Sequence, residues 1–138
     1  MVRNIDKIED LKEPYGEENY SKIEFVEADL QNSDKMIEAC ESCTHILHIA
    51  NPVPGDEKER VMSSNQMINQ ASIGMLSIIQ SCKQYKIKKL VVTSCASNII
   101  GTAWKKNQDP SDTKYDEGDF TGDHQYDELD GYMKSKIR

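Results

Sequence analysis

Two apolar runs separated by one long helical pattern constrain the fold more than any other feature of this sequence. Residues 44–50 and 89–94 are rich in β-branched and aliphatic side chains, which favours strands. The first run is almost continuously apolar, as is typical of a strand covered on both faces. Parallel strands need a long crossover connection, so we predict that these two are parallel and lie at or near the centre of one sheet. Between them, from about residue 56 to 85, apolar residues form a helical stripe: Val61, Ile68, Ala71, Met75, Ile78, Ile79 and Cys82.

Weaker patterns complete the predicted order. Residues 22–27 alternate between polar and apolar side chains, which favours a third strand. Gly74 costs the long helix about 1 kcal/mol relative to alanine, which indicates a close backbone contact there. Residues 107–130 carry nine acidic side chains and one lysine, which predicts a long surface loop. The alternation of strands and helices predicts an α/β fold, a parallel sheet with flanking helices. Further helices are predicted over residues 5–12, over residues 34–41 with Ser33 or Asp34 as cap, and from about residue 127.

Charge and length exclude several classes of partner. The 138 residues suit a single domain. The net charge of −7 argues against nucleic acid or an anionic membrane as the main partner. No apolar run is long enough to span a membrane, and the first residues are polar and charged rather than signal-like. We therefore expect a soluble, cytoplasmic protein that binds a small molecule.

Four cysteines raise the question of redox or metal chemistry. Cys40 and Cys43 form a Cys-x-x-Cys pair, but the sequence has no second such pair and only three histidines. Zinc sites of this type use four ligands, commonly as two such pairs. We therefore expect both thiols to serve packing, and we predict no metal site.

Chemically active side chains follow the predicted strands. In a parallel α/β sheet, ligands bind at the carboxyl ends of the strands. Asp29 follows the first predicted strand, and the other two strands end at Ala50-Asn51-Pro52 and at Thr93-Ser94-Cys95. All three segments are thus predicted to lie on one edge of the sheet.

Tyr132 and Lys136 are the candidate proton-transfer pair. Their spacing of four residues places them on one helix face, about 5–6 Å apart at Cβ. An ammonium at that distance stabilises the phenolate, so the tyrosine can exchange a proton with a substrate oxygen near neutral pH. The same spacing is common on ordinary helices, so the other residues decide whether it is functional.

Taken in order, the motifs give this chain a family resemblance. It resembles the extended short-chain dehydrogenase/reductases of the NAD-dependent epimerase/dehydratase superfamily, most closely the dihydroflavonol reductase-like and cinnamoyl-CoA reductase-like branch. Each motif is weak alone, but their shared order is specific. The motifs are Val2-Arg3, Glu27-Ala28-Asp29-Leu30, His48-Ile49-Ala50-Asn51-Pro52, Gly74, Val91-Val92-Thr93-Ser94, Asp116-Glu117 and Tyr132-x-x-Ser135-Lys136.

The resemblance implies a role for each matching residue around a bound NADP, with NAD as the alternative. Tyr132 would be the acid/base, and Lys136 would hold the ribose hydroxyls and tune Tyr132. The remaining residues would contact other parts of the cofactor: Arg3 the 2′-phosphate, Asp29 and Leu30 the adenine, Ala50, Asn51 and Pro52 the ribose and diphosphate, and Thr93 and Ser94 the nicotinamide ribose.

The chain also departs from the family pattern. It contains no glycine-rich turn, and the resemblance implies an internal fragment: residues 1–138 would be an incomplete NAD(P)-binding Rossmann domain that lacks the first strand and the carboxyl-terminal substrate region. In addition, Cys95 holds the position of the family's catalytic serine, with Ser94 and Ser97 as neighbouring hydroxyls. A thiol is a weak hydrogen-bond donor.

These observations favour an NADP-dependent oxidoreductase that transfers hydride between the nicotinamide and a carbonyl or alcohol substrate, with a Tyr-Lys acid/base pair. Relatives of this fold act on sugar nucleotides or 3β-hydroxysteroids, so the substrate class stays open. The alternative is a catalytically inactive, truncated or degenerate homologue. A third reading is an α/β domain in which the Tyr-x-x-x-Lys spacing arises by chance.

Overall fold

The computed structural model describes residues 1–53, 62–100 and 126–137. The chain divides into two compact units. The first unit comprises Met1–Ile46 and Ile73–Leu90, and the second Leu47–Ser72 and Val91–Arg138. The elements are η1 (Ile5–Leu11), α1 (Lys12–Tyr15), α2 (Glu17–Tyr20), α3 (Ser33–Glu38), β1 (His45–His48), α4 (Ser64–Gln84), β2 (Lys89–Val92), α5 (Ser97–Ile100) and α7 (Gly131–Ile137).

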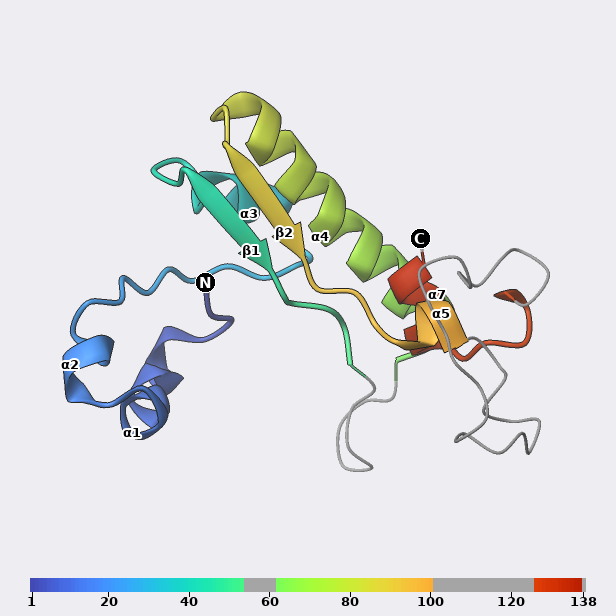
Figure 1. Cartoon of the computed structure of the whole chain (residues 1–138), viewed down its shortest axis with the longest axis horizontal. Coiled ribbons are helices and arrows are strands. Elements are labelled where there is room, and N and C mark those ends of the chain that lie inside the picture. The colour runs from blue at the N-terminus through green and yellow to red at the C-terminus, as the bar shows by residue number, and fades with distance from the viewer. Residues whose placement is uncertain (54–61, 101–125, 138) are drawn as a thin grey trace. The chain divides into compact units, whose positions relative to one another are not determined.

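β1 and β2 are hydrogen-bonded neighbours in one two-stranded sheet (Figure 1). The backbone N–H of Lys88 donates to the carbonyl of Thr44 at 2.8 Å, and that of Thr93 donates to the carbonyl of His48 at 3.0 Å. Donor and acceptor numbers rise together, so the strands are parallel. Both strands are shorter than the predicted runs, and α4 lies between them in the sequence, which confirms the strand–helix–strand order. The described residues therefore form a partial Rossmann-type α/β fold with a parallel sheet and flanking helices.

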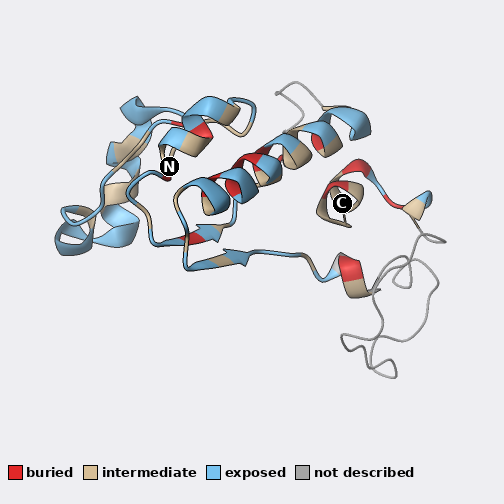
Figure 2. Cartoon of the chain, turned by 90° about the horizontal axis from the view of Figure 1, so that it is seen from above, coloured by how far each residue is buried: buried red, intermediate tan, exposed pale blue. Residues whose placement is uncertain are grey.

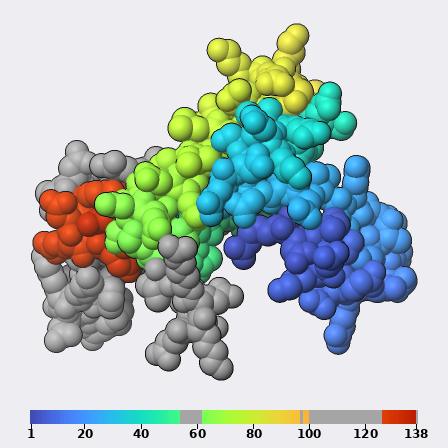
Figure 3. Space-filling view, turned by 180° about the vertical axis from the view of Figure 1, so that it is seen from behind, coloured from blue at the N-terminus to red at the C-terminus, as the bar shows by residue number. Residues whose placement is uncertain are grey.

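The core of the first unit lies between α3, α4 and one face of the sheet. Figure 3 shows the segment that contains α3 lying against α4. Partly buried side chains pack against this core, among them Leu30 from the segment before α3, Cys82 from α4 and Leu90 from β2. Burial of this apolar area contributes roughly 25 cal/mol per Å². The buried residues of the cluster are Ala28, Met36, Cys40, Ile46 and Ile78.

The predicted stripe on α4 is correct for Ile78, which is fully buried, and wrong for Ile79, which is 51% exposed. Val61 lies outside the described residues. Figure 2 shows buried and half-buried residues along one side of α4 and exposed residues along the other. The buried side includes Ser77 and Ser81, whose hydroxyls each donate to the carbonyl four residues earlier at 2.8 Å. Because these serines are internally hydrogen-bonded, they can replace apolar residues in the core.

The prediction that β1 is covered on both faces is wrong for the described residues. Ile46 is buried on the core side, whereas Leu47 is 62% exposed and Ile49 is 60% exposed. Successive side chains of a strand point to opposite faces. In the described part of the chain, the core cluster packs α3 and α4 against only the face that carries Ile46.

The strand predicted over residues 22–27 is reduced to one parallel bridge between Val2 and Glu27. The N–H of Val2 donates to the carbonyl of Val26 at 2.9 Å, and the N–H of Ala28 donates to the carbonyl of Val2 at 3.0 Å. An alternating pattern becomes a strand only where a partner runs beside it. Among the described residues, Val2 alone supplies such a partner, so the ladder does not extend.

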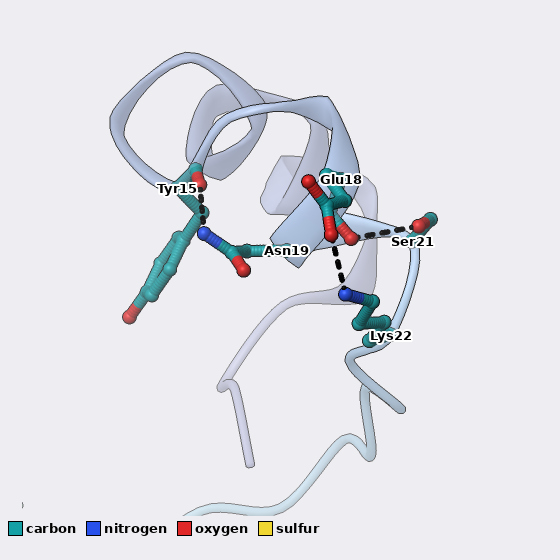
Figure 4. A network of polar contacts seen from close by, with 5 residues as sticks. All are labelled: Tyr15, Glu18, Asn19, Ser21 and Lys22. Carbon is teal, nitrogen blue, oxygen red and sulfur yellow. Dashed lines mark hydrogen bonds and ion pairs between the residues drawn. The ribbon is translucent and has the colours of Figure 1, made fainter.

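Residues 5–22 are held by local polar contacts rather than by the core (Figure 4). The Nδ2 of Asn19 donates to the carbonyl of Tyr15 at 3.1 Å, and the Nζ of Lys22 pairs with Oε1 of Glu18 at 2.8 Å. Exposed ion pairs of this kind contribute roughly 0–1 kcal/mol. The predicted helix over residues 5–12 is present as the 3₁₀ helix η1, which continues into α1.

α3 begins one residue earlier than predicted, and its cap differs. Asn32 is the cap, since its side-chain oxygen accepts from the N–H of Lys35 at 3.1 Å. Neither Ser33 nor Asp34 has this role, because both lie within α3. Asparagine caps helices about as well as serine or aspartate, so the sequence offered three suitable residues in a row.

The packing role predicted for Cys40 and Cys43 is confirmed. Cys40 is fully buried in the core, and Cys43 packs against it. Burial raises the pKa of the Cys40 thiol, an effect that the hydrogen bond with Ser81 partly offsets. All four cysteines are free. In the segments that the structure describes, no helix has the length and hydropathy to cross a membrane, and no cluster of potential metal ligands occurs.

Candidate functional site

Within the second unit, α7 brings Tyr132 and Lys136 to the carboxyl end of β2. The Nζ of Lys136 donates to the backbone carbonyl of Thr93 at 3.2 Å. The same ammonium lies 5.9 Å from the centroid of the Tyr132 ring, since the two residues are four apart in one helix. Thus one cation contacts both the end of a strand and the predicted acid/base.

Asn98, on α5, connects the same strand end to α7. Its Nδ2 donates to Ser94 Oγ at 2.8 Å and to the backbone carbonyl of Lys136 at 3.1 Å. α5 and α7 are in contact (Figure 1). Asn98 is 4% exposed, whereas Ser94 and the neighbouring Thr93 are exposed and Cys95 is half-buried. The Ser94 hydroxyl is therefore accessible and is held from one side.

Asn51 connects the loop after β1 to α7. Its Nδ2 donates to Ser135 Oγ at 3.0 Å and to the carbonyl of Pro52 at 3.1 Å. The hydroxyl of Ser135 in turn donates to the carbonyl of Tyr132 at 2.7 Å. Ser135 and Pro52 are buried, and Ala50 is exposed. Asn51 was predicted only to contact the cofactor, but its side chain also bonds to Ser135 of α7.

His48 is a titratable side chain beside this cluster to which the sequence assigned no role of its own. Burial lowers its pKa, and the positive charge of Lys136 lowers it further. The imidazole is therefore neutral at physiological pH. In the sequence it was the first residue of a motif shared with the family, and nothing there showed that it would share its surroundings with Lys136.

The lowered pKa of His48 makes stability depend on pH. As the pH decreases below the ordinary histidine pKa of 6.5, His48 takes up a proton in the unfolded chain before it does so in the folded chain. The free energy of unfolding therefore decreases as the pH decreases. We expect His48→Gln to flatten this fall between pH 6.5 and the lowered folded-state pKa, measured by urea denaturation at a series of pH values. The exposed His45 provides the matched control, His45→Gln. An unchanged slope in His48→Gln would show that another group causes the fall.

Three predicted cofactor contacts, Arg3, Asp29 and Leu30, belong to the first unit. A parallel bridge joins Val2 and Glu27. Arg3 follows Val2, and Asp29 lies two residues after Glu27, so both lie just beyond the bridge on two neighbouring segments of the chain. Arg3 is exposed. The Oδ1 of Asp29 accepts from the N–H of Gln31 at 2.8 Å, which fixes the turn that follows.

Leu30 explains the glycine in the long helix. A Cβ at Gly74 would lie 2.5 Å from Cδ2 of Leu30. The predicted close contact is therefore present, but with a side chain rather than with the backbone. The end of a leucine can rotate away.

Gly131, at the first position of α7, is the more constrained glycine. A Cβ there would lie 2.6 Å from both Cα and Oγ of Ser64. A backbone atom cannot move aside, so we expect Gly131→Ala to destabilise the chain by about 1–3 kcal/mol. Gly74→Ala is the matched control and should be near neutral, because about 1 kcal/mol of helix propensity offsets the shift of Leu30. Urea denaturation measures both, and equal losses would contradict this assignment.

Comparison with known proteins supplies independent information. Residues 1–129 match the 3-beta hydroxysteroid dehydrogenase/isomerase family, a range that ends before Tyr132 and Lys136. The chain is 31% identical over 104 residues to a dihydroflavonol 4-reductase of Medicago sativa, a match that covers 75% of this chain and 46% of the relative. It is 36% identical over 103 residues to a dihydroflavonol 4-reductase of Callistephus chinensis, covering 71% and 27%. The matches thus span about a quarter to a half of the relatives' length.

Proposed function

The chain belongs to the 3-beta hydroxysteroid dehydrogenase/isomerase family, and on that premise we propose that it contributes the acid/base part of a reductase site that uses NADP or NAD. The reaction is hydride transfer between the nicotinamide and a carbonyl or alcohol carbon of a small molecule. Relatives that carry the name dihydroflavonol 4-reductase support a reductase of this type. In this proposal nucleic acid and membranes are not partners.

The position of the Lys136 ammonium is the observation that carries the proposal. It is held 3.2 Å from the carbonyl of Thr93 at the end of β2 and 5.9 Å from the ring of Tyr132. Ligands of parallel α/β sheets bind at this end of the strands. This hydrogen bond joins residues 43 apart in the sequence, so the fold holds the ammonium at the strand end.

The donor set of the second unit suits the ribose and nicotinamide end of such a cofactor. Lys136 offers an ammonium and Ser94 an exposed hydroxyl, both able to bind a ribose or a reacting oxygen. The sequence has no glycine-rich turn, which is the backbone motif that binds a diphosphate in this fold. The residues present therefore fit the nicotinamide half of the cofactor but do not include the backbone motif that cradles its diphosphate.

When bound, the nicotinamide supplies or accepts the hydride. In the reduction, the hydroxyl of Tyr132 gives its proton to the carbonyl oxygen, so the substrate becomes an alcohol and Tyr132 a phenolate. Lys136 stabilises that phenolate electrostatically and binds the ribose hydroxyls. General acid catalysis of this kind contributes about 10²–10⁴-fold. Arg3, exposed in the first unit, is proposed to bind the 2′-phosphate and so to favour NADP. Asp29 and Leu30 are proposed to contact the adenine. Ala50, Asn51 and Pro52, in the loop after β1, are proposed to contact the ribose and diphosphate.

Titration of the 138-residue chain with NADPH and NADH, followed by nicotinamide fluorescence, tests the cofactor part of the proposal. We expect weak binding, with a Kd of about 1 mM or higher, because this chain has no backbone motif to bind the diphosphate. A Kd of about 1 mM corresponds to a binding free energy of roughly 4 kcal/mol. NADPH should bind more tightly than NADH if Arg3 contacts the 2′-phosphate, and Arg3→Gln should remove that difference. Micromolar affinity from a folded monomer would contradict the role given to the missing turn.

One observation favours a second function, that of a catalytically inactive homologue. Cys95 stands where the resemblance places the catalytic serine, and a thiol is a weak donor. In this alternative the chain keeps the fold without turnover. Assay of NADPH oxidation in a chimera with an active relative separates the two.

A further inference from the structure

Asn98 is a buried polar side chain to which neither the family match nor the sequence patterns assign a role. It is 4% exposed, and its Nδ2 is within hydrogen-bond distance of two oxygens, Ser94 Oγ and the main-chain carbonyl of Lys136. Among the described residues, its Oδ1 has no partner. Buried amides normally satisfy both ends, so the unequal arrangement calls for an explanation.

The carbonyl of Lys136 fixes which way the amide of Asn98 points. A carbonyl oxygen can only accept, so the Asn98 atom 3.1 Å away must be the nitrogen. The opposite orientation would place two acceptor oxygens against each other. The same nitrogen lies 2.8 Å from the hydroxyl of Ser94. Asn98 therefore donates to Ser94, and the Ser94 oxygen is an acceptor in that bond.

This assignment determines where the Ser94 proton goes. A hydroxyl has one proton and two acceptor lone pairs. Since Asn98 occupies a lone pair and has no acceptor facing Ser94, the O–H is free to point elsewhere. Ser94 is exposed and follows Thr93, whose carbonyl accepts from Lys136. The free O–H thus lies at the strand end that carries the proposed reductase site.

We propose that Asn98 is a positioning residue that makes Ser94 the hydrogen-bond donor to the substrate oxygen, in the role that the family resemblance gives to Cys95. The proposal rests on the proposed function for the identity of the substrate. It answers a question that the sequence left open, because a strand alone cannot tell which of two successive side chains faces the site. The Asn98 contacts favour the hydroxyl of Ser94 over the thiol of Cys95.

A thiol at position 94 tests the direction of the hydrogen bond without cofactor or substrate. In Ser94→Cys with Cys95→Ser, an N–H from Asn98 stabilises the thiolate and lowers the thiol pKa. Adding Asn98→Leu should raise that pKa and slow alkylation of residue 94 by iodoacetamide at pH 7 by about threefold or more. Peptide mass spectrometry distinguishes this site from the other cysteines, and thermal melts confirm that the compared variants are folded. Faster alkylation after Asn98→Leu would mean that Asn98 accepts rather than donates, and would overturn the proposal.

Nuclear magnetic resonance of the otherwise unaltered chain provides a measurement that does not require changing Asn98. Both side-chain amide protons of Asn98 should be protected from exchange, one by Ser94 and one by Lys136. Ser94→Ala should move the resonance of only one of them and raise its exchange rate. Unchanged resonances in Ser94→Ala would overturn the proposal. Because neither test measures turnover, their failure is distinguishable from a failure of the proposed reductase function, which the Tyr132 variant tests.

Discussion

Replacing Tyr132 with phenylalanine is expected to lower turnover by about 10³-fold and to leave cofactor affinity within about twofold. The substitution removes the hydroxyl that protonates the substrate oxygen but keeps the ring beside Lys136, so the binding surface is nearly unchanged. The reaction is assayed as NADPH oxidation in a chimera in which this chain replaces the matching segment of the Callistephus chinensis dihydroflavonol 4-reductase, 27% of whose length the match covers.

Two results would decide against this role. If Tyr132→Phe kept most of the activity of the chimera, another group would be the acid/base. If the unaltered chimera folded and bound NADPH but did not turn over, the chain would be a catalytically inactive homologue. In that case Cys95→Ser is the informative variant, since it restores a hydroxyl at the position that the resemblance assigns to catalysis.

Replacing Lys136 with methionine should harm both cofactor binding and turnover, by about 10²–10³-fold in kcat/KM. The methionine keeps the length of the side chain but removes the ammonium that bonds to Thr93 and faces the ring of Tyr132. A rise in KM for the cofactor together with a fall in kcat distinguishes Lys136 from Tyr132, which should affect kcat alone.

Lys134 provides the matched control on the same helix. Its Nζ donates to the carbonyl of Asp127 at 3.3 Å and lies 5.3 Å from the centroid of the Tyr126 ring, so it has contacts similar in kind to those of Lys136 but with other residues. Lys134→Met removes one positive charge from α7 and should change kcat/KM by less than about threefold. Equal losses from both variants would indicate a general effect of charge.

The strand–helix–strand order followed from the sequence because both strands are short apolar runs and the connection between them is long. The phase of α4 did not follow, because Ser77 and Ser81 satisfy their hydroxyls within the helix and take buried positions that an apolar pattern assigns to residues such as Ile79. The strand over residues 22–27 failed for a different reason. Alternation shows that a segment can pair, but the pairing depends on the partner that is present.

Some residues of the candidate site could likewise be predicted from the sequence, and others could not. Tyr132 and Lys136 were predictable because their relation is local, four residues apart in one helix. The motifs placed both Lys136 and Thr93 at the cofactor, but the contact between them is formed only by the fold. The sequence assigned no role to Asn98 or His48, because only the fold brings Lys136 near them. For Asn98 the sequence offered one weak signal, its spacing of four residues from Ser94.

The central claim is that Thr93, Ser94, Tyr132 and Lys136 form a binding site for the nicotinamide and its ribose. Titration of the ¹⁵N-labelled 138-residue chain with reduced nicotinamide mononucleotide, followed by backbone amide shifts, tests it most directly. We expect saturable shifts concentrated at residues 93–95 and 132–136, with a Kd of about 1 mM or higher, which Lys136→Met removes and Lys134→Met keeps. Shifts concentrated elsewhere, or shifts at these residues that Lys136→Met leaves intact, would contradict the claim.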